Sequence, residues 1–379
     1  MISRVLVLTS STGSGHDMRA RAFTKWIRQL HGDSIKVHVE QIIENGSMLG
    51  RFGVWVYNTI HKRLPFLHNI YFFIVELFVF THAQRVSFGG KYYRNLLKDF
   101  KPDLVLSVHD STNRGYFEDA KRILGDSVRC VTYCGEFSGG YGFSRNWVNT
   151  NADLLIARTN HCREHVLYLG MPMEKTSVFH KFLPPESFEQ FISDSEKEEY
   201  LNQLGMKKGK FTVFLATGGF GANHHLMYLN ALLPLAEHVQ VIIICGRNEV
   251  VRERVSNWCK NHPQLTAYIE GYSSRVADFL QVSDAVITRG GANTTTEALH
   301  FDCPLLYDAI GGMMPQERCT VNYFLDNGAA RIIKRPEALT HVVSEWCRFD
   351  KEYKDIRSRL DALHYDEDPR DLIQMILGS

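Results

Sequence analysis

Short apolar runs alternate with amphipathic segments along the chain. The apolar runs of the first half are 5–9, 35–42, 104–108, 128–134, 154–157 and 176–179. Those of the second half are 211–217, 239–245, 267–270, 285–288, 305–307 and 330–333. Helical periodicity lies between them, notably at 16–30, 114–124, 160–169, 224–235, 249–261, 275–282, 294–300 and 317–326. This alternation predicts an α/β protein with parallel sheets that helices cover on both faces.

The length of 379 residues is too great for one ordinary core, so we expect two domains. A polar, acidic stretch that contains Pro184 and Pro185 separates the two sets of strands. We predict a first domain over 1–180, a linker over 181–209, a second domain over 210–345 and a helical tail over 346–379. Both domains have the pattern of Rossmann-like folds, which bind ligands at the carboxyl ends of their strands. A cleft between these two edges is therefore the expected ligand site.

One turn in the second domain carries the strongest sign of chemistry. The fourth apolar run of that domain leads into Arg289, Gly290 and Gly291, and then into a helix. Glycines let a ligand approach the backbone closely, and a helix N-terminus attracts an anion. Glu297, one turn further on, is placed to accept hydrogen bonds from a ribose diol. The spacing of Thr294 and Glu297 also fits a capping box, in which Glu297 only bonds the backbone at the start of the helix.

A second turn of the same kind favours ligand binding. Strand 211–217 ends in Gly218, Gly219 and Gly221, with an amphipathic helix behind them. Two such turns in one parallel domain predict that the domain holds a diphosphate beside a ribose. We expect a nucleotide there, and in particular a nucleotide sugar.

The first strand leads into a loop with Gly13 and Gly15, and His16 follows at the start of a helix. Met18 stands where G-x-G-x-x-G has its third glycine, and the loop lacks the lysine of a P-loop, so NAD and ATP are disfavoured. The positive end of the helix dipole favours a neutral imidazole, which suits a general base that removes a proton from an acceptor hydroxyl. The alternative is that His16 only packs against the turn. Asp17 is the second candidate base.

His109 and Asp110 follow the strand at 104–108 and are expected at the same edge of the first sheet. They either orient the acceptor or His16, or they cap the next helix. The sequence leaves both interpretations open.

Composition is that of a soluble globular protein, with 44% hydrophobic and 22% charged residues, and the net charge of +1 gives no sign of nucleic-acid binding. Between residues 51 and 101, however, eight Lys or Arg residues oppose two acids. Lys62 and Arg63 precede an aromatic stretch with Phe66, Phe72 and Phe73, which indicates docking on an anionic membrane surface. The alternative is a pair of buried helices, and we favour a mixture in which one face packs and the rest docks.

The most apolar stretch, 64–80, is interrupted by polar residues and is shorter than the roughly 20 residues that span a bilayer, so we predict no transmembrane helix. The eight cysteines form no C-x-x-C pair, which argues against zinc. Because the chain starts almost directly with a strand, we expect no cleaved leader, reduced thiols and a cytoplasmic protein.

With these residues in place, the chain resembles the lipid-acceptor branch of the GT-B glycosyltransferases of family 28, the group of monogalactosyldiacylglycerol synthases and processive diacylglycerol glucosyltransferases. The resemblance is strongest at 13–16, 102–109, 218–221, 245–248, 271–272, 288–299 and 316–322. It implies two Rossmann-like domains that face each other across a cleft. It also implies an inverting transfer of a hexose from UDP-galactose or UDP-glucose to 1,2-diacylglycerol, without a metal or another cofactor, by an enzyme peripherally bound to the cytoplasmic face of the membrane.

The resemblance also implies roles for single residues. The two glycine turns serve the diphosphate, the helix acid Glu297 holds the ribose, and Arg247 and Tyr272 lie near the uridine. Gln316 and Glu317 bind sugar hydroxyls, and the loop residue His16 is the proposed base.

Several positions depart from the family pattern. Arg289 replaces a lysine, Ala292 and Asn293 replace Pro-Gly, and Pro315 replaces a glycine. On the acceptor side, the Thr-Asp that follows the fourth strand in the family appears here as Cys134-Gly135-Glu136. We still assign Asn293 to the donor site and Glu136 to the acceptor site. The altered acceptor side keeps three alternatives open: a polyprenyl-linked or other acceptor, a UDP-sugar epimerase of the same fold, and a nucleotide-sugar-binding protein without activity.

Overall fold

The computed structural model describes residues 2–12, 15–63, 72–73, 76, 89–216 and 224–378. Five predicted site residues, Gly13, Phe66, Gly218, Gly219 and Gly221, lie outside the described residues, as do the side chains of Lys62 and Arg63. The chain forms two compact units. Unit 1 comprises Met1–Glu186, Met314–Cys319 and Tyr365–Ser379, and unit 2 comprises Ser187–Met313 and Thr320–His364.

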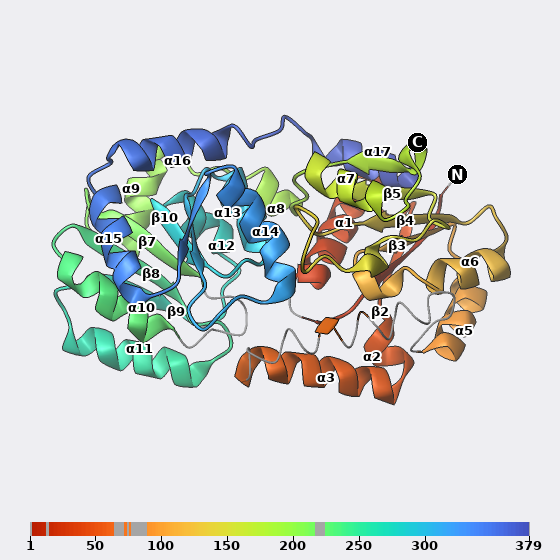
Figure 1. Ribbon diagram of the computed structural model, residues 1–379, viewed down its shortest axis with the longest axis horizontal. Coiled ribbons are helices and arrows are strands. Elements are labelled where there is room, and N and C mark those ends of the chain that lie inside the picture. Colours follow the sequence, from red (N-terminus) through yellow and green to blue (C-terminus); the bar gives the residue numbers. More distant parts are fainter. Residues whose placement is uncertain are drawn as a thin grey trace. The chain divides into compact units, whose positions relative to one another are not determined.

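Unit 1 is built on a six-stranded sheet of order β2-β1-β3-β4-β5-β6 in which every neighbouring pair is parallel (Figure 1). The strands are β1 (Arg4–Thr9), β2 (Lys36–Gln41), β3 (Leu104–Ser107), β4 (Arg129–Tyr133), β5 (Leu154–Ala157) and β6 (Thr176–Val178). The helices are α1 (Gly15–His31), α2 (Ile42–Gly46), α3 (Met48–Arg63), α5 (Gly90–Phe100), α6 (Tyr116–Leu124), α7 (Asn160–Tyr168) and α17 (Pro369–Leu377).

The core of unit 1 follows from the apolar runs of its strands. The side chains of 5–8 on β1 are all buried, because the sheet is covered on both faces. α1 packs against α17, and the indole Nε1 of Trp26 on α1 donates to the carbonyl of Leu183 at 2.8 Å. From β4, Arg129 donates through Nε to the carbonyl of Ile376 on α17 at 2.9 Å. The C-terminal helix is therefore part of the first unit.

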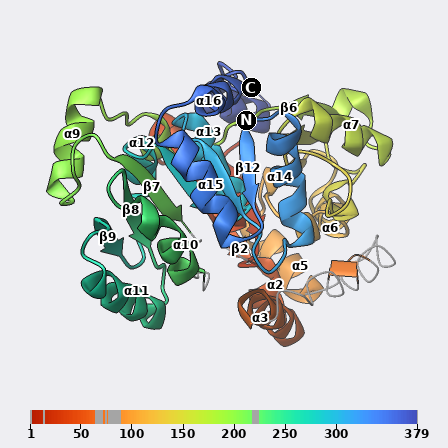
Figure 2. The ribbon, with the colours of Figure 1, turned by 60° about the vertical axis from the view of Figure 1, so that its left-hand side comes forward.

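Unit 2 contains the other six-stranded sheet, of order β12-β11-β10-β7-β8-β9 and again parallel throughout. Its strands are β7 (Phe211–Ala216), β8 (Val239–Ile244), β9 (Ala267–Glu270), β10 (Ala285–Thr288), β11 (Leu305–Asp308) and β12 (Ala330–Ile333). The helices are α9 (Asp194–Gln203), α10 (His225–Leu232), α11 (Glu249–Asn261), α12 (Val276–Gln281), α13 (Ala292–His300), α15 (Pro336–Trp346) and α16 (Lys351–Asp361). α10 packs against α15 beside the sheet (Figure 2). Two further helices, α8 (Pro185–Phe188) and α14 (Pro315–Asp326), contain boundaries between the units.

The prediction of parallel sheets is confirmed, and each predicted apolar run corresponds to a strand whose ends differ by one residue at most. The predicted helix at 294–300 begins earlier, at Ala292. All eight cysteines are free. Among the described residues, no helix is both long enough and apolar enough to cross a membrane.

Candidate active site

The turn after β10 leads directly into the N-terminus of α13. Gly291 is the N-cap residue of α13, with ordinary backbone angles of φ −68° and ψ 127°. A Cβ atom built on Gly291 would meet no other atom within 4 Å. Neither backbone strain nor packing among the described residues therefore requires glycine here. A ligand that approaches the backbone closely would need this open space in front of the helix.

The capping-box interpretation of Thr294 and Glu297 is wrong. The N-cap is Gly291 rather than Thr294, because α13 starts at Ala292, and glycine has no side chain with which to cap the helix. The first N–H groups of a helix lack partners within the helix, so this end can bind an anion. Glu297 lies in the second turn and is only 8% exposed.

The hydroxyl-rich first turn of α13 contributes less than its sequence suggests. Thr295 is buried, with its hydroxyl 3.3 Å from that of Tyr307, and the Thr296 hydroxyl donates to the carbonyl of Ala292. These two hydroxyls therefore make contacts within unit 2. Thr294 and Asn293 are half-buried at the start of the helix, and Arg289, one residue before the glycines, donates to the carbonyl of Gly312 at 3.3 Å.

A histidine–carboxylate pair in unit 2 was missed by the sequence analysis. His224 lies just before α10, and its Nδ1 is 2.9 Å from Oδ2 of Asp308 at the end of β11. Asp308 is 1% exposed, and although burial raises its pKa, hydrogen bonds from His224 and Tyr228 bring the pKa below its ordinary value. The carboxylate is thus ionised and holds the Nδ1 edge of the His224 ring. The two residues are 84 positions apart, and no spacing rule connects them.

Two further residues predicted to bind the sugar donor, Arg247 and Tyr272, lie close together after β8 and β9. Arg247 follows β8 and Tyr272 follows β9, and the guanidinium carbon of Arg247 is 4.7 Å from the centre of the Tyr272 ring. Both side chains are exposed. An exposed aromatic ring beside a cation offers a stacking surface for a planar base.

Gln316 and Glu317 occupy the first turn of α14, in the segment Met314–Cys319 that belongs to unit 1. Glu317 is buried and accepts a hydrogen bond from the backbone N–H of Met314 at 3.0 Å. Gln316 lies 3.9 Å from the sulfur of Met314 through its Nε2. The carboxylate of Glu317 therefore stabilises the start of α14.

In unit 1 the predicted acceptor residues gather where β1, β3 and β4 end, since these strands are neighbours in the sheet. His16, in the first turn of α1, reaches the end of β3, with Nδ1 2.9 Å from the carbonyl of Val108. Its ring centre is 4.1 Å from that of His109. Burial, followed by the charges of His109 and Arg19, holds the pKa of His16 well below its ordinary value. The imidazole is neutral, as a general base must be.

The second candidate base, Asp17, is held in a structural network. Its carboxylate accepts from the hydroxyls of Thr9 at 3.1 Å and Ser11 at 2.8 Å, and from the amide of Gln41 at 3.2 Å. These three donors occupy the oxygens that a base would need. Asp17 fixes the loop that precedes His16.

Of the two roles left open by the sequence, His109 takes the capping role, and a part in orienting the acceptor or His16 stays a prediction. His109 accepts a hydrogen bond from the N–H of Ser111 at 3.0 Å through Nδ1, which caps the short 3-10 helix 110–112. Its Nε2 is 2.6 Å from the hydroxyl of Thr12, in the loop before His16. Burial acts to raise the pKa of Asp110, but His109 and His16 hold it below its ordinary value. The pair thus caps a helix and contacts the surroundings of His16.

Glu136 follows β4 and is close to two cations. Burial raises the pKa of its carboxyl to about 7, while the charges of Arg19 and Arg158 oppose that rise. Arg19, on α1, is 6% exposed, and its Nη2 is 2.9 Å from Nδ1 of His16. The sequence analysis did not identify Arg19, because an arginine in an amphipathic helix is normally taken as part of the exposed face.

The membrane-docking prediction falls largely on α3 and the residues that follow it. Met48, Leu49, Phe52 and Trp55 on α3 are exposed, with Met48 at 87% and Trp55 at 61%. The rings of Phe52 and Trp55 stack with centres 5.7 Å apart. Of the predicted aromatic residues, Phe73 is exposed and Phe72 is half-buried. Such a row of exposed apolar side chains is uncommon on a protein that contacts only water.

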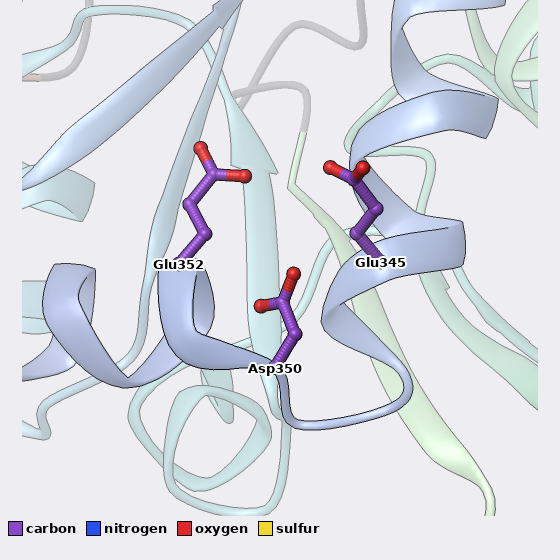
Figure 3. Close-up of side chains that lie close together, drawn as sticks. All are labelled: Glu345, Asp350 and Glu352. Carbon is purple, nitrogen blue, oxygen red and sulfur yellow. The ribbon is translucent and has the colours of Figure 1, made fainter.

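One group of acidic side chains among the described residues has ligand-like spacing. Glu345, Asp350 and Glu352 bring carboxylate oxygens within 4.8 Å of one another where α15 ends and α16 begins (Figure 3). Arg331 donates to Glu352 at 2.6 Å, and Asp350 accepts from the N–H of Tyr353 at 2.8 Å as the N-cap of α16. These bonds give two of the acids structural roles, and we assign no ion to the group.

Comparison with known proteins yields a consistent set of similarities. Residues 212–345 match the family described as Glycosyltransferase family 28 C-terminal domain. A processive diacylglycerol beta-glucosyltransferase from Bacillus pumilus is 25% identical over 99% of this chain and 94% of its own length. A protein of the same name from Bacillus licheniformis is 21% identical over 95% of this chain and 91% of its own length.

Solved structures share the fold at lower sequence identity. Acinetobacter baumannii MurG has a TM-score of 0.62 at 16% identity, with 100% of both chains covered. Anabaena Alr3699/HepE in complex with UDP and glucose has a TM-score of 0.60 at 14% identity, covering 100% of this chain and 99% of that one. UDP-GlcNAc 2-epimerase from Neisseria meningitidis, bound to UDP-GlcNAc, has a TM-score of 0.61 at 14% identity, with 99% and 100% covered.

Proposed function

The chain belongs to the family 28 group of GT-B glycosyltransferases and is a UDP-sugar-dependent enzyme; from this premise we propose that it transfers galactose or glucose to 1,2-diacylglycerol. The proposal includes inversion at the anomeric carbon and needs no bound metal. The observation that carries it is the start of α13 at Gly291, where a Cβ atom would meet nothing within 4 Å, within the segment that matches the family. The relatives, whose name specifies diacylglycerol, support this acceptor.

The donor is held by unit 2 in this proposal. The N–H groups at the start of α13 bind the diphosphate, with Arg289 beside them. His224, fixed by Asp308, follows the second glycine turn in the sequence and adds a polar ring nitrogen to the donor side. Glu297 holds the ribose, and Tyr272 with Arg247 forms the surface for the base. Together these groups stabilise the charge that develops on the departing UDP, which is the task of a divalent ion in other enzymes.

The acceptor hydroxyl is activated by unit 1. With the proton of His16 on Nδ1 and donated to the carbonyl of Val108, Nε2 is the unprotonated ring nitrogen left to face a substrate. Nε2 takes the proton of the hydroxyl while its oxygen bonds to the anomeric carbon and the bond from that carbon to UDP breaks. Attack opposite to the leaving group inverts the configuration.

The exposed apolar side chains of α3 support a peripheral membrane position. Four of them fall at positions 48, 49, 52 and 55, which form one stripe of a helix. In the proposal this stripe enters the lipid interface, with the nearby cations directed at anionic head groups. The enzyme then takes diacylglycerol from the bilayer without extracting it into water.

The deciding experiment supplies labelled UDP-glucose and UDP-galactose in parallel to the purified protein with vesicles that contain diacylglycerol. Mass spectrometry of the lipids should show a hexosyl-diacylglycerol with one donor, and NMR of the product should show the β-anomer. EDTA should leave the rate unchanged. Two control reactions contain a polyprenyl phosphate sugar as the acceptor or no acceptor at all. Transfer to the polyprenyl phosphate sugar, or isomerisation of the UDP-sugar without an acceptor, would contradict the proposal.

A further inference from the structure

Arg19 carries a buried charge that the proposed mechanism does not use. We propose that Arg19 is a positioning residue for His16: its guanidinium keeps the imidazole neutral and fixes Nε2 as the nitrogen that faces the substrate. The inference rests on the proposed function only in taking His16 as the base. It adds a residue to that site for which neither the sequence motifs nor the comparisons give a role.

Burial of the Arg19 side chain is energetically unfavourable, which suggests that the buried cation has a role. The side chain is 6% exposed, and Nε and Nη1 have no hydrogen-bond partner among the described residues. Burying an ionised group without full pairing is unfavourable in general, because the lost hydration is not replaced. Burial lowers the pKa of Arg19, but the charge of Glu136 opposes this, and arginine stays protonated in proteins. The cation is therefore retained next to His16.

Gly135 provides the space that Arg19 occupies. A Cβ atom built on Gly135 would lie 1.4 Å from Nη1 of Arg19 and 2.4 Å from its Cζ. Gly135 does not have a positive φ, so its backbone would accept an L-residue. The absence of a side chain at Gly135 is thus matched to the guanidinium rather than to a turn. Arg19 and Gly135 form one arrangement, made by α1 and the loop after β4.

The contacts of His16 explain what the cation does. Nδ1 lies 2.9 Å from the carbonyl of Val108 and 2.9 Å from Nη2 of Arg19. Only the tautomer with its proton on Nδ1, which donates to the Val108 carbonyl, leaves Nε2 able to accept a proton from the substrate. In this tautomer Arg19 acts through its charge, because a cation at this distance disfavours the imidazolium. Arg19 therefore occupies the Nδ1 side of the ring and opposes protonation of the ring.

The other groups that face His16 do not replace this effect. His109 follows β3 with its ring centre 4.1 Å away, and Asp110 in the 3-10 helix acts in the opposite direction by favouring the imidazolium. Trp147 lies 6.2 Å away and carries no charge. Burial and the charge of His109 also lower the pKa of His16, whereas Asp110 raises it. Removal of Arg19 takes away one of the lowering effects, so the pKa of His16 should rise.

The direct test is NMR titration of His16 in the full chain, with its signal assigned by its loss in His16→Gln. In Arg19→Gln, which is uncharged, the pKa of His16 should rise by about one unit or more. Arg19→Lys keeps the cation and should stay closer to the wild type. Arg21→Gln, an exposed arginine on the same helix, is the matched control and should change nothing. An unchanged His16 titration in folded Arg19→Gln overturns the inference.

Gly135→Ala gives a second route that leaves every charged residue in place. Its Cβ should displace the guanidinium and raise the pKa of His16 as Arg19→Gln does. In an Arg19→Ala background, Gly135→Ala should add no further shift, because no guanidinium is left to displace. Equal shifts with and without Arg19 would overturn the inference. If the Arg19 variants fail to fold, an unchanged His16 titration in folded Gly135→Ala overturns it instead.

Activity separates this inference from the proposed function. If His16 is the base, the acid limb of the kcat/KM profile should move to higher pH in Arg19→Gln and Gly135→Ala, because the ring is protonated at higher pH. A shifted titration with an unmoved limb would support the role of Arg19 and contradict the base role of His16. An unshifted titration would contradict the role of Arg19 even if transfer to diacylglycerol is found.

Discussion

At the scale of single residues, the site depends on how a few ionisable groups are buried. His16 and Glu136 lie in the same unit, and burial moves their pKa values in opposite directions, down for the imidazole and up for the carboxyl. Both shifts favour the neutral form, as desolvation always does. The acceptor site is therefore one in which the candidate base is uncharged before the substrate arrives.

His16→Ala should lower turnover by about 100-fold or more, because general-base catalysis contributes a factor of that order. KM for the UDP-sugar should change little, since the residues proposed to hold the diphosphate, the ribose and the base lie in unit 2. Steady-state kinetics on vesicles with diacylglycerol would measure both constants. His31→Ala, at the exposed end of the same helix, is the control. Near-normal turnover in His16→Ala would exclude the base role.

Glu136 predicts a dependence of stability on pH. Its pKa is raised from 4.5 to about 7 in the folded protein, so the folded state binds the proton more tightly than the unfolded state does. The stabilisation is complete below pH 4.5 and is lost as pH rises through about 7. Glu136→Gln removes this loss. Urea unfolding of both proteins from pH 4.5 to pH 8 should show the variant gaining stability relative to the wild type, and parallel curves would contradict the prediction.

At the scale of elements, the function depends on what precedes and follows each strand. The strands were predicted because continuous apolar runs bounded by polar turns are typical of parallel sheets. The capping box was misread because the helix starts two residues before Thr294, and cap spacing fixes no starting point by itself. Arg19 was missed because helical periodicity gives positions on a face, whereas the space beside Gly135 exists only in three dimensions. His224 and Asp308 meet only through the order of the strands.

Gly291→Ala tests the start of α13. The added methyl group meets no atom of the described residues within 4 Å, so the free energy of unfolding should fall by no more than about 1 kcal/mol, the cost of alanine at an N-cap. UDP should bind at least about tenfold more weakly, because the methyl group occupies the space through which the diphosphate approaches. Calorimetric titration with UDP and thermal unfolding give the two quantities. Unchanged UDP affinity would place the diphosphate elsewhere.

The stripe on α3 can be tested with Phe52→Ser and Trp55→Ser together. Loss of two large apolar side chains should weaken binding to vesicles with anionic lipid by at least about tenfold, since each buried ring contributes about 1.5–3 kcal/mol. Sedimentation with vesicles measures this. Tyr168→Ser removes an aromatic residue that is 84% exposed on α7 and should have no effect. Equal losses in both proteins would mean that the stripe has no special role.

At the scale of the whole molecule, the sequence indicated two α/β halves because the strand pattern occurs twice. It did not show that Tyr365–Ser379 returns to unit 1, since the amphipathic pattern of α17 does not specify which sheet the helix covers. Specific contacts decide this. His180 donates through its backbone N–H to Glu367 at 2.7 Å, and Arg129 holds the last turn of α17.

Deletion of residues from Tyr365 onward should destabilise unit 1 while unit 2 keeps its fold. The deletion exposes the side of α1 that α17 covers and leaves Arg129 without its carbonyl partners. Hydrogen exchange should show lost protection in β1, β3 and β4, with β7, β8 and β10 unchanged. UDP should still protect unit 2. Equal loss of protection in both sheets would show that the two units unfold together.

The return of α17 also sets the order of events during protein synthesis. The strands of unit 1 are translated first, yet the helix that completes their cover leaves the ribosome only after all of unit 2 has been made. Unit 2 is continuous from Ser187 to His364 except for the short segment Met314–Cys319, so most of it can fold as it emerges. The earlier half of the nascent chain must therefore keep an apolar flank uncovered until translation passes Leu377, which makes it the half that chaperones would be expected to protect.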